Sequence, residues 1–355
     1  MRPRLACALL ALAACVPLAA GCNRKPTLMP ASADSTAAAP DSFTVHARQA
    51  VEAWDAGDDA QGSTASALLA REALEARPNA PWAERLRGVL DSLGIGAEVA
   101  GSDRASVVNL FSRTKGEGDS WPWLFWREGG GVRTQALETR GMKLASVATR
   151  GMDDASEPGD SAQVAVLWDR RVGAGLQPQL TVWRHAPGGR WDLLQTLGAD
   201  SLGGVGTGEF AGDDSTTELT TRTFRPTPYF DECATCPHVY HERRFEWGAA
   251  GFTRLAEMPV PSPYSTFTAF VAALVANDRA RASEEVVDPS LIEFARRLEW
   301  HVTTKGRWRV APATDESALE MVFFRGPKDA FRVMFEPRDG DWMIAGFEPT
   351  NRAVE

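Results

Sequence analysis

The stretch Trp123-Leu-Phe-Trp-Arg-Glu-Gly-Gly-Gly-Val-Arg-Thr-Gln-Ala-Leu137 sets the pattern for the middle of the chain. An apolar run closes on tryptophan, a glycine turn follows, and a second strand-like run begins. Apolar runs closed by tryptophan recur at Trp168, Trp183 and Trp247. Short runs of this kind, separated by Gly, Asp and Pro clusters, are typical of antiparallel strands joined in sequence. We therefore predict an antiparallel β-meander or propeller-like domain over residues 100–258.

The strands of this domain are predicted from β-rich runs bounded by turn residues. They are Trp123–Arg127, Val132–Leu137, Lys143–Ala148, Gln163–Trp168, Gln179–Arg184, Trp191–Gln195, Glu218–Thr223, Val239–Trp247 and Phe252–Leu255. The interval from Trp126 to Trp168 matches one propeller blade, but the other tryptophan intervals do not keep it. Strand alternation places Trp121 and Trp123 on one face and Trp126 on the other, and core packing is the expected role of most tryptophans.

A glycine- and acid-rich stretch follows, Gly204-Val-Gly-Thr-Gly-Glu-Phe-Ala-Gly-Asp-Asp-Ser-Thr-Thr-Glu-Leu219. It resembles a degenerate FG-GAP or VCBS-type repeat, in which an Asp-rich loop between two strands holds calcium. Calcium needs six to eight oxygen ligands, commonly from carboxylates at alternate positions. Here Asp213 and Asp214 are adjacent, so we expect a surface turn and no calcium site.

Helices are predicted on both sides of this domain. In residues 44–99, Trp82, Leu86, Val89, Leu90 and Leu93 share one helical face, and an earlier helix is expected near 65–76. We therefore expect a helical pair before the β domain.

Residues 264–355 form a second α+β module, separated from the β domain by the proline-rich linker 259–263. Two helical faces are followed by four strand candidates, 307–311, 319–325, 330–336 and 342–347. The order, with Phe270-Val-Ala-Ala-Leu-Val-Ala-Asn-Asp278 and Asp339-Gly-Asp-Trp-Met-Ile344, resembles the NTF2-like, or cystatin-like cone, superfamily. The resemblance implies a curved antiparallel sheet against helices, which often encloses a pocket.

The amino terminus carries a secretion signal. Arg2 and Arg4 precede an apolar run from Leu5 to Ala20, which is shorter than the roughly 20 residues that span a membrane. The stretch Leu18-Ala-Ala-Gly-Cys22 resembles the lipobox of bacterial lipoproteins. This resemblance implies that residues 1–21 are removed and that Cys22 carries the lipid. Two other interpretations stay open, a lipobox ending at Cys15 and a plain secretory signal.

The anchor and the composition together predict where the protein works. Residues 22–43 are rich in Pro, Ala, Ser and Thr and read as a disordered tether. Acylation by two chains would hold the protein stably on the bilayer. Asn23 at the position where the lipoprotein family often has a retaining Asp favours the outer membrane, facing the periplasm, in a cell with two membranes. The net charge of −9 argues against nucleic acid as a partner.

Two cysteines remain in the body, within Asp231-Glu-Cys-Ala-Thr-Cys-Pro-His-Val-Tyr-His241. A disulfide between Cys233 and Cys236 is the leading interpretation for an oxidising compartment. A redox pair and a zinc site formed with His238 and His241 are the alternatives. The two histidines differ in strand parity, so a straight strand would direct them to opposite faces. Pro237 stands where covalent haem attachment needs histidine, which excludes that cofactor.

Catalytic motifs of the common hydrolases, metalloproteases and phosphate-loop proteins are absent from the sequence. Candidates for acid–base chemistry in the NTF2-like module are Asp288, Glu299, His301 and Glu336, none of which lies in a motif. We therefore expect a non-catalytic binding or scaffold protein for a protein partner or small ligand, with no cofactor. The alternatives are an isomerase- or dehydratase-like enzyme in the NTF2-like pocket, and a metal or redox role at the two cysteines.

Overall fold

The computed structural model describes residues 41–152, 158–159, 161–212, 217–311, 314–315 and 317–350. The chain divides into two units, residues 1–40 and residues 41–355, and only the second contains described residues. The predicted signal peptide, both lipid-site candidates Cys15 and Cys22, and nearly all of the tether lie outside them. None of the described helices combines the length and the apolar character that crossing a membrane requires.

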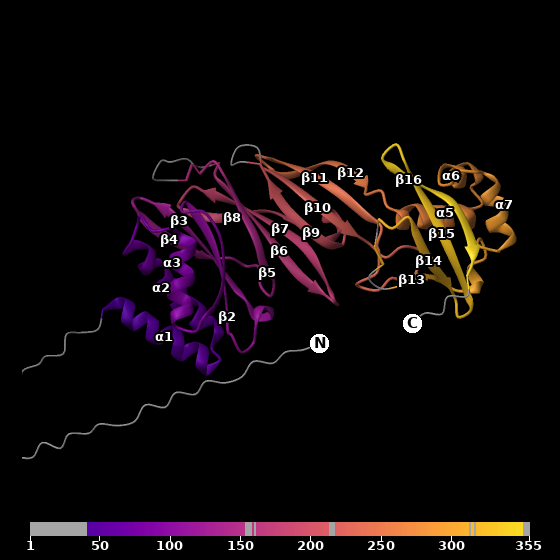
Figure 1. Ribbon diagram of the computed structural model, residues 1–355. Coiled ribbons are helices and arrows are strands. Elements are labelled where there is room, and N and C mark those ends of the chain that lie inside the picture. Colours follow the sequence, from indigo (N-terminus) through magenta and orange to yellow (C-terminus); the bar gives the residue numbers. More distant parts are fainter. Residues whose placement is uncertain are drawn as a thin grey trace, which may run out of the picture. The chain divides into compact units, whose positions relative to one another are not determined.

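The described part is a mixed α+β fold with seven α-helices and four antiparallel sheets of four strands each (Figure 1). Within each sheet, strands that follow one another in the sequence are hydrogen-bonded neighbours. The predicted α+β class and the antiparallel meanders are therefore confirmed. The described strands do not close into a barrel.

Three helices begin the fold, α1 (Ser42–Ala56), α2 (Asp59–Glu75) and α3 (Trp82–Ser92). The sequence analysis predicts two of them. The third, α1, lies almost wholly within the helical segment predicted over residues 44–99 but is not predicted as a separate helix, although Phe43, Ala47, Ala50, Val51 and Trp54 form an apolar stripe. Its start is fixed by Asp41, whose carboxylate accepts the backbone N–H of Thr44 at 2.7 Å.

The helices cover one face of the first sheet, which consists of β1 (Gly96–Gly101), β2 (Ala105–Phe111), β3 (Trp121–Glu128) and β4 (Gly131–Ala136). In β3, Phe125 packs towards the helices, whereas Leu124 and Trp126 pack towards the second sheet. Trp123 also packs on the helix side, as the predicted alternation requires. Because β2 is buried along almost its whole length, it lacks the alternation that would have revealed it.

The second and third sheets repeat this meander. The second contains β5 (Lys143–Arg150), β6 (Gln163–Val172), β7 (Gly175–Ala186) and β8 (Arg190–Leu197). The short helix α4 (Ala199–Leu202) leads to the third, β9 (Val205–Ala211), β10 (Glu218–Phe224), β11 (Tyr240–Gly248) and β12 (Gly251–Pro259). One apolar core lies between the first two sheets and another between the second and third (Figure 1).

The recurring tryptophans have one structural position. Trp126, Trp183 and Trp247 lie in β3, β7 and β11, the third strand of each sheet, and all three are buried. Trp168 lies in the second strand of its sheet, β6. Because it belongs to a different position in the meander, the sequence interval that includes it is not the repeat length.

Glutamine side chains link successive sheets. Gln135 of β4 exchanges two hydrogen bonds with the backbone of Trp191 in β8, at 2.7 and 2.9 Å. Gln195 of β8 does the same with Phe252 in β12, at 2.9 and 2.7 Å. In β12, Ala256 occupies the position that corresponds to Gln195 in β8. Ala256 follows Phe252 by four residues, as Gln195 follows Trp191, and in both strand pairs a register shift lies between the two residues. The third sheet therefore lacks the side chain that would bind a further sheet.

The stretch that resembles an FG-GAP or VCBS-type repeat forms β9 and the start of β10 in its described parts. The sequence analysis does not predict β9, whose Val-Gly-Thr-Gly start has the composition of a turn. Asp213 and Asp214, on which the calcium question depends, lie outside the described residues.

The C-terminal module contains α5 (Pro263–Ala276), α6 (Arg279–Glu284) and α7 (Ser290–Arg297), and then β13 (Trp308–Val310), β14 (Glu320–Arg325), β15 (Asp329–Arg338) and β16 (Asp341–Pro349). Of these elements only α6 is missing from the sequence prediction. The core of the C-terminal module is aromatic and includes Phe267, Phe323, Trp300 and Trp308. The helix α5 begins with a capping box in which Ser262 and Ser265 bond each other's backbone N–H.

The segment between β10 and β11 packs into the core of the C-terminal module. Phe230 is buried among the aromatic residues of the C-terminal module, and Cys236 packs there as well. Its backbone continues the sheet, because the N–H of Trp308 donates to Tyr229 and the N–H of Asp231 donates to Trp308, at 2.8 and 2.7 Å. The two modules are thus joined by packing and by main-chain hydrogen bonds, in addition to the covalent connection at 259–263.

Candidate functional site

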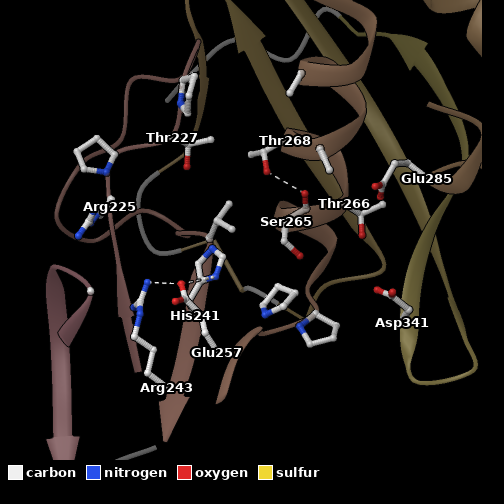
Figure 2. Close-up of a pocket in the computed structure, with 18 of the residues that line it drawn as sticks. Arg225, Thr227, His241, Arg243, Glu257, Ser265, Thr266, Thr268, Glu285 and Asp341 are labelled. Atoms are coloured by element: carbon white, nitrogen blue, oxygen red, sulfur yellow. Dashed lines mark hydrogen bonds and ion pairs between the residues drawn. The ribbon is translucent and has the colours of Figure 1, made fainter. Parts of the chain in front are cut away.

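A cavity of about 780 Å³ lies where the third sheet meets α5 (Figure 2). Its walls come from the loop after β10, from β11 and β12, from α5 and α6, and from the start of β16. Volumes of this size are typical of small-ligand sites. Because the third sheet and the C-terminal module both contribute walls, the docking of one on the other shapes the cavity.

One wall carries a basic cluster around Glu257. Arg243 donates to this carboxylate, and Arg254 donates to it at 2.8 Å, while the imidazole of His241 lies 3.8 Å away. Burial favours the neutral form of Glu257, but the hydrogen bond and charge of Arg243 hold its pKa below the usual range. Arg243 is only 9% exposed, and its Nε has no hydrogen-bond partner among the described residues.

Arg225 adds a more accessible cation to this wall. Its side chain is 57% exposed and donates to the backbone oxygen of Asp200 at 3.2 Å, while the Asp200 carboxylate lies 3.8 Å away. Arg225 is therefore weakly paired compared with Arg243. Together the three guanidinium groups outnumber the carboxylates of Glu257 and Asp200, so this wall is positive.

The opposite wall carries two carboxyl groups, Glu285 just after α6 and Asp341 at the start of β16 (Figure 2). Burial and the neighbouring charge of Asp341 raise the pKa of Glu285 to about 7, which Arg281 offsets only in part. The backbone fixes this pairing, because the carbonyl of Glu285 accepts the N–H of Ile344 in β16 at 2.8 Å. Glu285 is thus a carboxyl group that can hold or release a proton near neutral pH.

The floor between these walls is a stripe of small side chains on α5. Ser265, Thr268, Ala269 and Ala272 line the cavity at helical spacing. Thr268 donates to the carbonyl of Ser265 at 2.8 Å, so its hydroxyl is already used within the helix (Figure 2). Four prolines at the rim restrict the backbone of the loops that frame the cavity, namely Pro226, Pro228, Pro259 and Pro261.

A second ionisable group, Glu232, is buried near the cavity but is fully engaged. Its carboxylate accepts the hydroxyl of Tyr264 at 2.9 Å and the backbone N–H of Thr227 at 3.2 Å, and Nδ1 of His238 lies 3.5 Å away. Burial alone would raise the pKa of Glu232, but the groups from His238, Thr227 and Tyr264 outweigh it and hold the pKa below the usual range. This arrangement ties the loop before β11 to α5.

The predicted cysteine site is adjacent to Glu232. The sulfur atoms of Cys233 and Cys236 lie 2.20 Å apart, at disulfide distance. The two histidines proposed as metal ligands do not converge on them. His238 stacks on Phe224 with ring centroids 3.5 Å apart, whereas His241 pairs in register with Thr223 on the other face of the sheet. The described residues hold no group of three or more His, Cys, Asp or Glu side chains able to bind a metal.

The predicted acid–base candidates are not brought together. Asp288 accepts the N–H of Ser290 at 2.8 Å just before α7, Glu299 pairs with Lys305, and Glu336 is exposed. His301 is half-buried and follows Trp300, whose ring fills the aromatic core. None of the four lines the cavity between the modules.

The sequence analysis does not single out Glu285 and Asp341. A local signal exists for Glu285, because the apolar residue Val286 between two predicted helices indicates a segment that packs inward. Asp341 comes from a hairpin far along the chain, and only the pairing of Val286 with Ile344 brings the two carboxyls together. A comparison of the chain with protein-family models, curated proteins and solved structures finds no match.

Proposed function

We propose that this chain is a lipid-anchored envelope protein whose folded body binds a ligand or protein partner in the cavity, without converting it chemically. The observation that carries the proposal is the cavity itself, whose walls hold two oppositely charged groups of side chains supplied by two separately packed cores. Fixed, charged and concave sites of this size favour specific binding of a small polar ligand or of a protruding segment of a partner.

Site-specific photocrosslinking in cells tests this binding function. A photoreactive amino acid at Thr268 faces the cavity, and the same amino acid at Thr220, on the open face of β10, is the control. We expect an adduct from Thr268 only, and its loss when Ala272→Trp fills the cavity. Equal adducts from both positions, or none from Thr268, would contradict the proposal.

The anchor is proposed from the lipobox resemblance at Cys22 and is tested separately. Full-length chains with Cys22→Ala and with Cys15→Ala are expressed with an alkyne-tagged fatty acid. Label and membrane association should be lost in the first variant and kept in the second, and the outer membrane should hold the labelled protein in a two-membrane cell. Labelling that depends on Cys15 would move the anchor to that residue.

We also propose that residues 264–355 adopt an NTF2-like cone. The module supports this by its order, three helices followed by the four-stranded meander β13 to β16. An experimental structure of the full chain should superpose this sheet on the curved sheets of that superfamily. A flat sheet or a different strand order would contradict the assignment.

A second candidate function is proton-transfer catalysis in the cavity, because the pKa of Glu285 at about 7 suits a general acid or base. Native mass spectrometry of the full processed chain and of Glu285→Gln, each purified from the same cells, distinguishes the two functions. An enzyme would accumulate unreacted substrate on the variant, and the bound mass would differ. A binding protein would carry either the parent's ligand or no ligand on the variant, and no new mass would appear.

A further inference from the structure

The two charged walls of the cavity differ in sign, and this difference specifies a class of ligand. Arg225 and Arg243 lie on the side of the third sheet, whereas Glu285 and Asp341 lie on the side of the C-terminal module (Figure 2). Arg254 of β12 adds to the basic side, and Arg281 of α6 offsets part of the acidic side. A ligand with charge of one sign would meet repulsion at one of the two walls. A ligand with an anionic and a cationic end would be complementary to both.

We propose that the cavity binds a short linear zwitterion of the peptide type, with its carboxylate at Arg225, Arg243 and Arg254 and its ammonium group at Glu285 and Asp341. This inference rests on the proposed binding function and specifies its ligand. The small side chains of Ser265, Ala269 and Ala272 leave room for an extended chain against α5, and the volume of about 780 Å³ accommodates several residues.

Groups already present in the cavity leave capacity for both ends of such a ligand. On the basic wall, the side chains of Arg225 and Arg254 are 57% and 54% exposed, so both can direct donors towards a ligand, while Arg243 supplies positive charge from behind them. A carboxylate is a natural acceptor for guanidinium donors. On the acidic wall, burial is the main cause of the raised pKa of Glu285, and repulsion by the carboxylate of Asp341 adds to it. An ammonium group between them would relieve that repulsion.

Binding should therefore be coupled to release of a proton from Glu285. The charged groups that act on Glu285 are Asp341 of β16 and Arg281 and Glu284 of α6, and His241 faces the cavity from β11. Below pH 7 the ligand must displace the proton, so affinity rises with pH up to that point. A peptide ammonium group stays charged in this range, since its pKa is about 8.

The test uses four probes on the full processed chain in detergent, by titration calorimetry: tetra-alanine, its N-acetylated form, its C-terminal amide, and the doubly blocked peptide. We expect tetra-alanine to bind tightest, and each single block to weaken binding at least tenfold. Affinity for tetra-alanine should rise about tenfold between pH 5.5 and 7, with proton release seen as a buffer-dependent heat.

Two variants assign the ends. Glu285→Gln should reduce the penalty of acetylation, to which Asp341 also contributes, and should remove the pH dependence, whereas Arg225→Gln should reduce the penalty of amidation. The matched controls Glu246→Gln and Arg170→Gln, which are exposed outside the cavity, should change neither, and His241→Asn should keep the pH dependence.

Equal affinity for the four peptides would overturn the inference, and so would failure of tetra-alanine to bind. In either case a cavity-specific crosslink from Thr268 would still support the binding function, so the two failures are distinguishable. Loss of the crosslink as well would remove both.

Discussion

Glu232 and Glu285 are both carboxyl groups drawn out of water near the junction of the two modules, yet their environments have opposite consequences. Glu232 accepts hydrogen bonds from Thr227 and Tyr264 and lies beside His238, and its pKa lies below the usual range. Glu285 faces Asp341 instead, and its pKa is raised to about 7. Burial acts in the same direction on both groups, so the partners decide the outcome.

The comparison separates a structural carboxylate from one available for binding. Glu232 has its acceptor capacity filled by groups from the loop before β11 and from α5, so its charge serves to hold the modules together. The charged form of Glu285 is destabilised while the cavity is empty. A cation that enters the cavity would therefore stabilise that charged form and be held by it. Three measurements test this distinction.

The largest effect is expected from Glu232→Gln. The change removes a buried charge that accepts several hydrogen bonds, and the free energy of unfolding should fall by about 2–4 kcal/mol. Urea unfolding measures it, with Glu246→Gln as an exposed control expected to change stability by less than about 0.5 kcal/mol. A loss no larger than that of the control would contradict the structural role of Glu232.

The combined change Cys233→Ser and Cys236→Ser should have an intermediate effect. Opening so short a loop lowers stability by about 2 kcal/mol in the chain-entropy description, and it loosens the segment that carries Glu232. Urea unfolding of the oxidised protein gives the value. Elemental analysis is the control, because a metal present in the parent and lost in the variant would replace the disulfide interpretation by a metal site.

The smallest change in the free energy of unfolding is expected from Glu285→Gln, and the sign of its pH dependence is the informative result. Since the folded-state pKa lies above the ordinary value of 4.5, the stability contributed by the protonated group is present below pH 4.5 and is lost as the pH rises through about 7. The parent should therefore lose on the order of 1 kcal/mol relative to the variant between pH 5 and 8, after allowance for solvent screening.

The stability contributed by Glu232 should change with pH in the opposite direction. Its folded-state pKa is lowered, so its contribution is present above pH 4.5 and is lost as the pH falls further. Stability profiles of the parent and both variants across this range would therefore diverge at opposite ends. A common slope for Glu232→Gln and Glu285→Gln would contradict the comparison.

Much of the secondary structure follows from local sequence. Strands with one solvated face, such as β5 and β11, show alternation, and α3 and α5 show apolar stripes with recognisable starts. The misses differ in cause. β2 is buried on both faces and β9 has the composition of a turn, so neither shows a periodic signal, whereas β1 and α6 are only six residues long.

The site is less predictable because it depends on contacts between distant segments. The two histidines lie apart, as the sequence analysis expects, but strand parity is not the reason, because His238 precedes β11 and stacks on Phe224 while His241 lies within the strand. Glu285 and Asp341 meet only through the bridge between Val286 and Ile344, and the basic wall combines a loop with two strands. Residue spacing in the sequence predicts neither the proximity of Glu285 to Asp341 nor the assembly of the basic wall.

The glutamine links have a consequence for how the body loses its structure. Each of the three sheets packs only on its neighbours, through separate cores, so its stability is a sum of nearest-neighbour terms, as in solenoid arrays. Ala256 ends the series, since it offers nothing to a fourth sheet. Amide exchange should therefore be graded along the series, slowest in the second sheet, which is covered on both faces.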